Sequence, residues 1–338
     1  MRKSLIALAV MGASTVAFAA SNVTLYGVIE EGVVVQKAKH KDTTVSLKSG
    51  FDQGSRWGLK GTEELGNGYA VSFILEQGFN ADTGAAGDSS KAFNRETMMF
   101  VSGGFGKLGF GRTGALSSGA QSQQILTGWA LGTGYSMSAW NSLTSGTLRV
   151  DNAIAYASPV FNGLSLHAIY SNGIVDDTSK WSENNHYYGI GAKYQANAIK
   201  SSLIFEAIDN KGAEEKRVFT INYGLEYNLG SVTPMFAYQW YNQDGGKKVN
   251  QFGLSAKVSV GGGDALVGGR YLFGHNEALT GDDKVRSWNV GAAYVYPLSK
   301  RTALKAYAGY ADSSKGWKNK EDALYNGYTF LVGMRTSF

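Results

Sequence analysis

Apolar and polar residues alternate with a period of two along most of this chain. From 219 to 227 every odd position carries Phe, Ile, Tyr, Leu or Tyr, whereas the even positions carry Thr, Asn, Gly and Glu. The same alternation recurs at 69–76, 232–240, 251–258 and 287–294. Because successive side chains of a strand point to opposite faces, each segment predicts a strand with one apolar and one polar face.

The length of these segments indicates the kind of sheet that they form. Each is about ten residues long, which matches a tilted transmembrane strand of ~9–11 residues. Strands of soluble sandwiches are typically shorter, at about 5–6 residues. The pattern therefore predicts an all-β fold, a 16-stranded antiparallel transmembrane β-barrel with both termini on the periplasmic side. The expected strands are 22–35, 45–61, 68–79, 93–103, 106–113, 147–158, 163–173, 185–196, 199–209, 215–228, 231–242, 248–259, 264–275, 285–296, 301–312 and 323–338.

The connections between these strands alternate in length. One set is short, such as 64–68 and 297–300, and the other is longer and charged, such as 174–184 and 276–284. Short periplasmic turns and longer external loops are typical of outer-membrane barrels. The third long connection, 114–146, carries no charged side chain. A structureless loop of this length usually has a function, and we expect it to fold inward as a constriction. The alternative is a plain external loop.

The first residues predict a secretory signal peptide. Arg2 and Lys3 precede an apolar run at 5–16, and 17–19 is a small-x-small cleavage site. We expect cleavage after Ala19, or after Ala20, so that 1–19 is the signal peptide and 20–338 is the barrel. The apolar run is shorter than the ~20 residues that span a bilayer. The remainder contains no apolar run of that length either, so a membrane role must come from a barrel.

The composition excludes several classes of site. The chain has no Cys, which removes disulfides and thiolate metal ligands, and its 45 Gly are interleaved with aromatic and aliphatic residues. The formal net charge of +5 is mild, and the basic residues are scattered. We therefore expect no nucleic acid partner. We also expect no cofactor and no metal.

Six segments spread over nearly the whole mature chain resemble Gram-negative general diffusion porins of the neisserial and betaproteobacterial type, and they occur in family order. They are 23–27 (VTLYG), 56–68 (RWGLKGTEELGNG), 104–108 (GFGKL) with 111–112 (GR), 156–159 (YASP), 298–302 (LSKRT) and the terminal Phe338.

The resemblance implies a protein of the outer membrane that is not an enzyme. It implies a homotrimer in which each barrel has its own water-filled pore, narrowed by the third loop, for passive diffusion of small hydrophilic solutes and ions. The expected partners are outer-membrane lipids and lipopolysaccharide, together with the barrel-assembly machinery, which would recognise the C-terminal strand ending in Phe338.

Porin selectivity depends on pore width and on the charges that face the constriction. In the family that this chain resembles, basic side chains on the barrel wall face the third loop. Alternation places four charged side chains in the lumen, because their neighbours on the other face are apolar: Arg56 and Lys60 beside Trp57 and Leu59, and Arg149 and Asp151 beside Leu148, Val150, Ile154 and Tyr156.

Two further arginines are candidates for the constriction. Arg112 matches the Gly-Arg pair that precedes the inward loop in the family, but it shares parity with the outward Phe110. A bulge or the end of the strand would redirect it inward. Arg95 is ambiguous, because both faces of 95–101 carry apolar residues.

The uncharged loop departs from the family pattern, in which the third loop often carries carboxylates. Without them, the wall arginines predict a moderately anion-preferring pore. The loop residues of interest are Gln121, Trp129, Tyr135 and Trp140. The three aromatic rings would offer a stacking surface in the alternative reading, a substrate-specific channel.

Other functions have weaker support in the sequence. The segment 104–109 fits G-x-G-x-x-G, but it spans a hairpin turn rather than the strand–helix junction of a dinucleotide site. A barrel protease or phospholipase would need a loop histidine, such as His186 or His275, paired with Asp or Ser. An adhesin or a structural barrel is a further alternative, and it would differ from a channel in showing no conductance across a membrane.

Overall fold

The chain forms one antiparallel sheet that closes on itself. The computed structural model describes residues 22–118, 121–131, 149–174, 180–211, 216–314, 317, 323 and 325–338. The predicted signal peptide at 1–19 lies outside these residues. The strands are β1 (Asn22–Ala38), β2 (Thr44–Ser49), β3 (Arg56–Gly66), β4 (Tyr69–Gly78), β5 (Glu96–Gly103), β6 (Gly106–Gly114), β7 (Arg149–Ala157), β8 (Leu164–Ser171), β9 (His186–Ala196), β10 (Ile199–Asp209), β11 (Val218–Tyr227), β12 (Val232–Gln243), β13 (Lys247–Val260), β14 (Gly263–Asn276), β15 (Lys284–Pro297), β16 (Thr302–Ser313) and β17 (Gly327–Ser337).

The barrel has sixteen strand positions around its circumference, because β2 and β3 together occupy one of them. Both pair with β1, in a ladder that breaks between Glu31↔Ser49 and Val28↔Arg56. We call residues 50–55, which leave the ladder at this break, the 50–55 insert. A single strand at 45–61 was expected here, and that expectation was wrong for this segment. Every other expected strand is confirmed, with ends that differ by a few residues.

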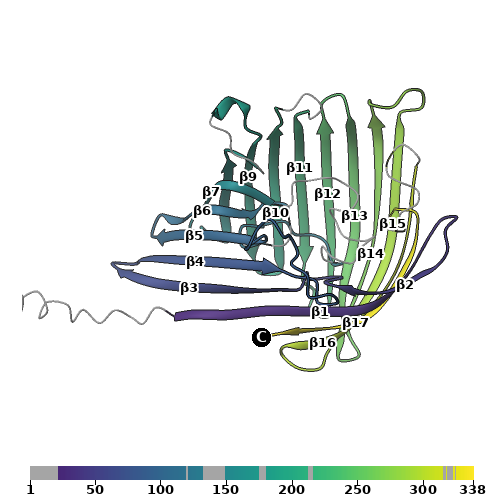
Figure 1. Cartoon of the computed structure of the whole chain (residues 1–338), viewed down its shortest axis with the longest axis horizontal. Helices are drawn as coiled ribbons and strands as arrows, with labels where there is room; N and C mark the ends of the chain where they lie inside the picture. The colour runs from purple at the N-terminus through teal and green to yellow at the C-terminus, as the bar shows by residue number, and fades with distance from the viewer. Residues whose placement is uncertain are drawn as a thin grey trace, which may run out of the picture.

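Closure is made by β1 and β17, which pair antiparallel from Val28↔Ser337 to Ala38↔Gly327. Beyond the ladder, the backbone N–H and C=O groups of Gly27 and Phe338 exchange two hydrogen bonds of 3.1 Å. Figure 1 shows the C-terminus beside β1, with β9 to β13 upright and β1, β3 and β4 lying across them. Opposite walls of a barrel cross in this way because the strands tilt.

The two ends of the barrel differ in their connections, as predicted. One end has tight turns, as at 67–68 and 197–198, whereas the other has longer connections, as at 79–95 and 172–185. Asn67 has a φ of 53° and Gly68 a φ of 78°. A two-residue hairpin turn needs positive φ at both positions, which Asn-Gly adopts at little cost.

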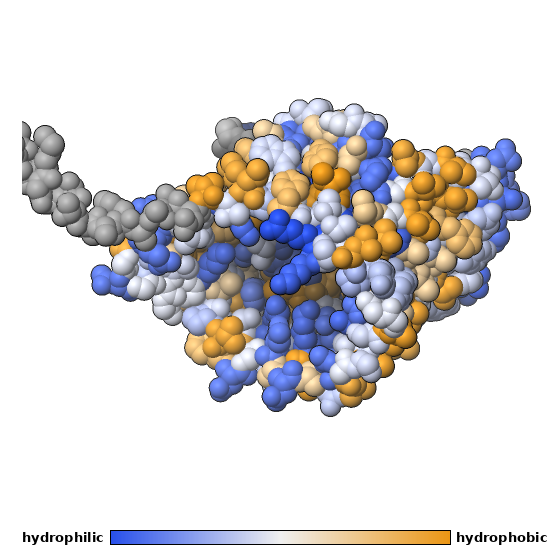
Figure 2. Space-filling view, turned by 90° about the horizontal axis from the view of Figure 1, so that it is seen from below, coloured by the Kyte–Doolittle hydropathy of each residue, from blue (hydrophilic) through white to orange (hydrophobic). Residues whose placement is uncertain are grey.

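The outer surface of the barrel is apolar and the inner surface is mostly polar. Outward side chains such as Leu254 and Val332 are exposed, whereas their neighbours Ser255 and Leu331 are buried. Figure 2 shows hydrophilic residues around a hollow and hydrophobic residues over the outside. No helix in the described part of the chain is long and apolar enough to cross a membrane.

One stretch of the inner wall is apolar as well. Met98 and Phe100 of β5 are buried in a cluster with Leu116 and Ile125, which lie in the connection between β6 and β7. This cluster explains why both faces of 95–101 carry apolar residues. The outward positions meet solvent or lipid, and the inward positions pack against the connecting segment.

Candidate functional site

A bulge in β7 sets the direction of the charged side chains near its start. Gly111 pairs with Ala153 and Thr113 with Val150, so that two residues of β7, Asp151 and Asn152, oppose Arg112 alone. Asn152 has a φ of 50°, which is the left-handed conformation that asparagine tolerates. A bulge reverses the alternation of faces beyond it.

The bulge has two consequences for the expected orientations. Arg112 turns toward the carboxylate of Asp151, and its Nε donates to the carbonyl of Asn94 at 2.9 Å. Val150 was expected to face lipid, but it is fully buried in the inner apolar cluster. The orientation of Val150 was therefore predicted wrongly, because strict alternation fails at the bulge.

Arg56 and Arg95 meet at one carboxylate of the barrel wall. Glu76 of β4 accepts from Arg95 Nε at 2.7 Å and lies 3.2 Å from Arg56 Nε. The Tyr26 hydroxyl donates to the same carboxylate at 3.0 Å. Arg95 precedes β5, so its side chain is free of the strand alternation that left its direction ambiguous.

Asp151 forms the second ion-paired centre. It pairs with Arg112 and with Lys91, whose Nζ lies 2.5 Å from the carboxylate. Arg149 adjoins this centre, because its Nε donates to the carbonyl of Arg95 at 3.2 Å. The amide oxygen of Gln121, in the orientation that satisfies its neighbours, accepts from Arg149 Nη2 at 3.1 Å.

We call Arg56, Lys91, Arg95, Arg112 and Arg149, with the carboxylates Glu76, Glu96 and Asp151, the basic group. It brings together all four arginines named from the sequence, and its five cations exceed its three carboxylates. Lys60 lies apart from these ion pairs. It is exposed on β3, with its Nζ 5.2 Å from the centroid of the Tyr26 ring.

Glu76 and Glu96 were not singled out from the sequence. Alternation placed Glu76 on the polar face of its strand, so a signal was available. The missing information was the register, which pairs Glu76 with Gly58, two residues from Arg56. The uncharged loop therefore does not leave the wall arginines without carboxylates, because the wall supplies its own.

The connecting segment after β6 is held by carboxylates of the wall. Glu96 accepts from the Ser122 hydroxyl at 2.5 Å, and Glu206 accepts from the Ser117 hydroxyl at 2.6 Å and from its N–H at 3.1 Å. Glu226 accepts from the Thr127 hydroxyl, and from the N–H of Gly128 at 3.2 Å. A segment without charges thus satisfies three wall carboxylates through hydroxyl and backbone donors.

Trp129 and Leu131 continue this segment along the wall. The guanidinium of Arg270 lies 5.2 Å from the centroid of the Trp129 ring. A Cβ on Gly268 would lie 2.8 Å from Trp129 and 3.2 Å from Leu131, so the glycine makes room for both side chains. Tyr135 and Trp140 lie outside the described residues.

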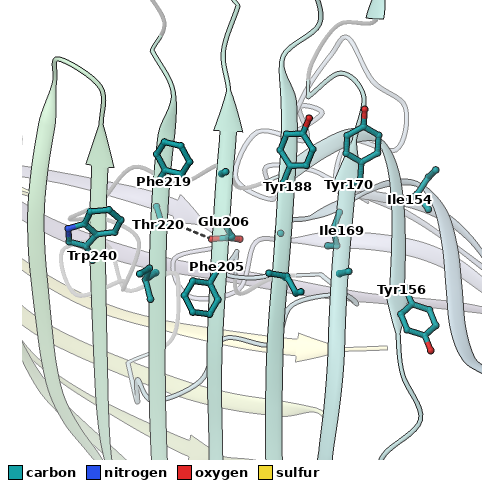
Figure 3. Close-up of a pocket in the computed structure, with 15 residues that line it drawn as sticks. Ile154, Tyr156, Ile169, Tyr170, Tyr188, Phe205, Glu206, Phe219, Thr220 and Trp240 are labelled. Atoms are coloured by element: carbon teal, nitrogen blue, oxygen red, sulfur yellow. Dashed lines mark hydrogen bonds between the residues drawn. The ribbon is translucent and has the colours of Figure 1, made fainter. Parts of the chain in front are cut away.

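The outer wall carries an open apolar groove of about 610 Å³ across β7 to β12. In Figure 3, Phe205 and Phe219 line it, whereas Glu206 and Thr220, the next residues of the same strands, hydrogen bond to each other at 3.2 Å. The groove is a feature of the apolar outer surface, whereas the polar contacts described above involve the opposite face of the wall.

Of the two histidines considered for an enzymatic site, His275 is exposed beside an aspartate and His186 is buried among aromatic rings. His275 Nδ1 lies 3.1 Å from Asp283 in an exposed pair at the end of β14. His186 is buried, stacked on Tyr170 and hydrogen bonded to the carbonyl of Trp181. Among the described residues, no three His, Asp or Glu side chains are grouped to hold a metal ion.

The chain is similar to porins in both sequence and structure. The family model described as Gram-negative porin matches residues 4–316. An outer membrane porin protein of Bordetella pertussis is 29% identical over 96% of this chain and 97% of its own length. Outer membrane porin protein 32 of Delftia acidovorans is 30% identical over 90% of this chain and 88% of its own length.

Solved structures support the same assignment of the fold. The anion-selective porin from Comamonas acidovorans aligns with a TM-score of 0.71 and 24% identity, over 94% of this chain and 100% of that one. The trimer form of OmpT from Vibrio cholerae aligns with a TM-score of 0.67 and 15% identity, over 94% and 100% of the two chains. The resemblance seen in the sequence is therefore confirmed: this chain belongs to the family of Gram-negative porins, proteins of the outer membrane.

Proposed function

We propose that this porin forms a water-filled channel for passive diffusion of small hydrophilic solutes and ions, with a moderate preference for anions. The observation that carries the preference is the basic group, in which five cations meet three carboxylates. A fixed excess of positive charge along a narrow passage raises the local concentration of anions. The similar porin from Comamonas acidovorans is described as anion-selective, which agrees with this proposal.

The 114–146 loop is proposed as the element that narrows the channel. Support comes from its described part, where hydroxyl and backbone donors of Ser117, Ser122 and Thr127 meet three wall carboxylates. Those carboxylates lie on the inward side of β5, β10 and β11. The neutral loop and the basic group would then border the same passage.

Ion selectivity of purified protein in a planar bilayer tests the proposal. In a gradient of potassium chloride, the reversal potential should carry the sign of a chloride preference. A reversal potential with the sign of a potassium preference would contradict it. Liposome swelling separates general diffusion from a substrate-specific channel, since rates ranked by solute size alone support general diffusion.

The assembly of the protein is proposed to follow the family pattern. The trimer form of OmpT is the structural precedent for a homotrimer. Contacts with lipid and lipopolysaccharide are expected over the apolar outer surface. Recognition by the barrel-assembly machinery is expected at the C-terminal strand, which ends in Phe338. Native mass spectrometry in detergent checks the stoichiometry, for which we expect three chains.

A further inference from the structure

The 50–55 insert leaves the ladder of β1 and turns toward the inner face of the barrel. Its Phe51 is fully buried, and its ring lies over Gly32 of β1 and Gly333 of β17, which are paired directly. A Cβ on Gly32 would lie 2.9 Å from the Phe51 ring, and one on Gly333 would lie 2.5 Å from it. Two glycines in register thus form the recess that receives Phe51.

An ion-paired group fixes the insert in this position. The carboxylate of Glu30 accepts from the N–H groups of Asp52 and Gln53, at 2.6 and 2.7 Å. Lys305 of β16 is almost fully buried, and its Nζ lies 2.6 Å from Glu30 and also pairs with Asp52. Charged groups at this depth are costly to separate, so the insert has one strongly preferred conformation.

The insert also contacts the arginines of the basic group. The carbonyl of Gly54 accepts from Arg56 Nη1 at 2.9 Å. A Cβ on Gly54 would lie 2.9 Å from Arg95 Nη1, which is closer than van der Waals contact, so the guanidinium group of Arg95 packs closely against the backbone at Gly54. The backbone of the insert therefore borders the guanidinium groups that share Glu76.

The other side of the insert adjoins the connecting segment after β6. Phe51 belongs to one buried apolar cluster with Leu131 of that segment, against which Trp129 also packs. The remaining members come from β1, β15, β16 and β17. The insert thus lies between the basic group on one side and the third connection on the other.

From these contacts we infer that the 50–55 insert is a second element of the constriction, which positions Arg56 and Arg95 and so sets the anion preference. The inference rests on the proposed channel function and adds a positioning role for Phe51, Asp52 and Lys305. Anions are attracted less well by arginines whose guanidinium groups are free to move away from the passage.

Substitutions that release the insert test this role. Phe51→Ala empties the glycine recess, Asp52→Glu keeps the charge but displaces the carboxylate from its pair with Lys305, and Gly54→Ala presses on Arg95 without touching the anchor. Each should lower the chloride-over-potassium permeability ratio about twofold or more, because the arginines lose their fixed position. Phe161→Ala, at an exposed turn on the same chain, is the matched control and should leave the ratio unchanged.

Thiol labelling provides a second test that does not depend on the stability of a variant. The chain has no cysteine, so Gln53→Cys would carry a single thiol. If the insert borders the passage, an anionic methanethiosulfonate should lower the single-channel current of Gln53→Cys, because the label narrows the passage and offsets its positive charge. The same reagent should leave the current of Ser182→Cys, in the exposed 172–185 connection, unchanged.

The outcomes separate this inference from the proposed function. A wild-type channel without anion preference would contradict the proposed function. An anion-preferring wild type whose ratio survives Phe51→Ala, Asp52→Glu and Gly54→Ala, and whose Gln53→Cys current is insensitive to the reagent, would overturn the role of the insert alone.

Discussion

Glu76 lies between two guanidinium groups, and its negative charge offsets part of the excess positive charge of the basic group. Arg95 Nε is 2.7 Å and Arg56 Nε 3.2 Å from its carboxylate. All three side chains are largely shielded from water, so their interactions are screened less by salt than those of surface pairs. At the residue scale, selectivity should therefore follow the balance of charge at this point.

Opposite substitutions in this ion pair should shift selectivity in opposite directions. Glu76→Gln removes a negative charge and is expected to raise the chloride-over-potassium ratio, whereas Arg95→Gln removes a positive charge and should lower it. The reversal potential in a salt gradient measures both. Glu183→Gln, on the exposed rim, is the control and should behave as wild type. A shift of both variants in one direction would show that their charge is not the cause.

Gly27 is a second residue at which the absence of a side chain matters, because the ring of Phe338 occupies the space that a Cβ would take. A Cβ here would lie 2.2 Å from Cζ of Phe338, whose backbone closes the barrel. Gly27→Val should lower stability by about 1 kcal/mol, the lower end of the usual cost of overpacking, because the half-exposed ring of Phe338 can move aside.

The heat-modifiability of the folded band in gel electrophoresis checks this prediction. Gly27→Val should convert to the unfolded form at a lower temperature than wild type. Gly104→Ala is the control, because nothing lies within 4 Å of the added Cβ. Equal transition temperatures for Gly27→Val and wild type would contradict the proposed contact.

At the scale of elements, the period-two pattern predicted fifteen of the sixteen barrel strands, with ends that differ by a few residues from those of the structure. It failed at the 50–55 insert and at the bulge of Asp151 and Asn152. Both are local departures from the ladder, whose cause lies in partners far along the chain. Phe51 needs the recess of Gly32 and Gly333, and Asp52 needs Lys305. Alternation carries no information about such pairings.

The candidate site was predictable to a lesser degree than the strands. Arg56 and Asp151 were placed inward by alternation, and Arg112 by its resemblance to the family. Their ion pairs depend on cross-strand register and on the 79–95 connection, which supplies Lys91 and Arg95. Sequence spacing within one strand does not determine those contacts, so the wall carboxylates went unnoticed.

The hydrogen bonds between wall carboxylates and the connecting segment after β6 should limit the motion of that segment. Ser117→Ala removes a hydroxyl that donates to Glu206 at 2.6 Å. A hydrogen bond to a charged group contributes about 1.5–3 kcal/mol, so the segment should move more freely. We expect greater noise in the open-channel current, with the chloride preference retained. Ser182→Ala, in the exposed 172–185 connection, should show the noise of wild type.

At the scale of the whole molecule, the barrel separates two environments. Its outer surface is apolar, including the groove across β7 to β12, and its inner surface carries the basic group and the carboxylates that hold the connecting segment. Such a wall fits a membrane outside and water inside. Because the preference is electrostatic, it should weaken as the Debye length falls from about 10 Å at 0.1 M salt to about 3 Å at 1 M.

The reversal potential of wild-type channels in a potassium chloride gradient, measured at low and at high mean salt concentration, tests the central claim most directly. The excess of cations in the basic group predicts a potential with the sign of chloride preference, larger at low salt and smaller at high salt. A potential with the sign of potassium preference at low salt would contradict the account.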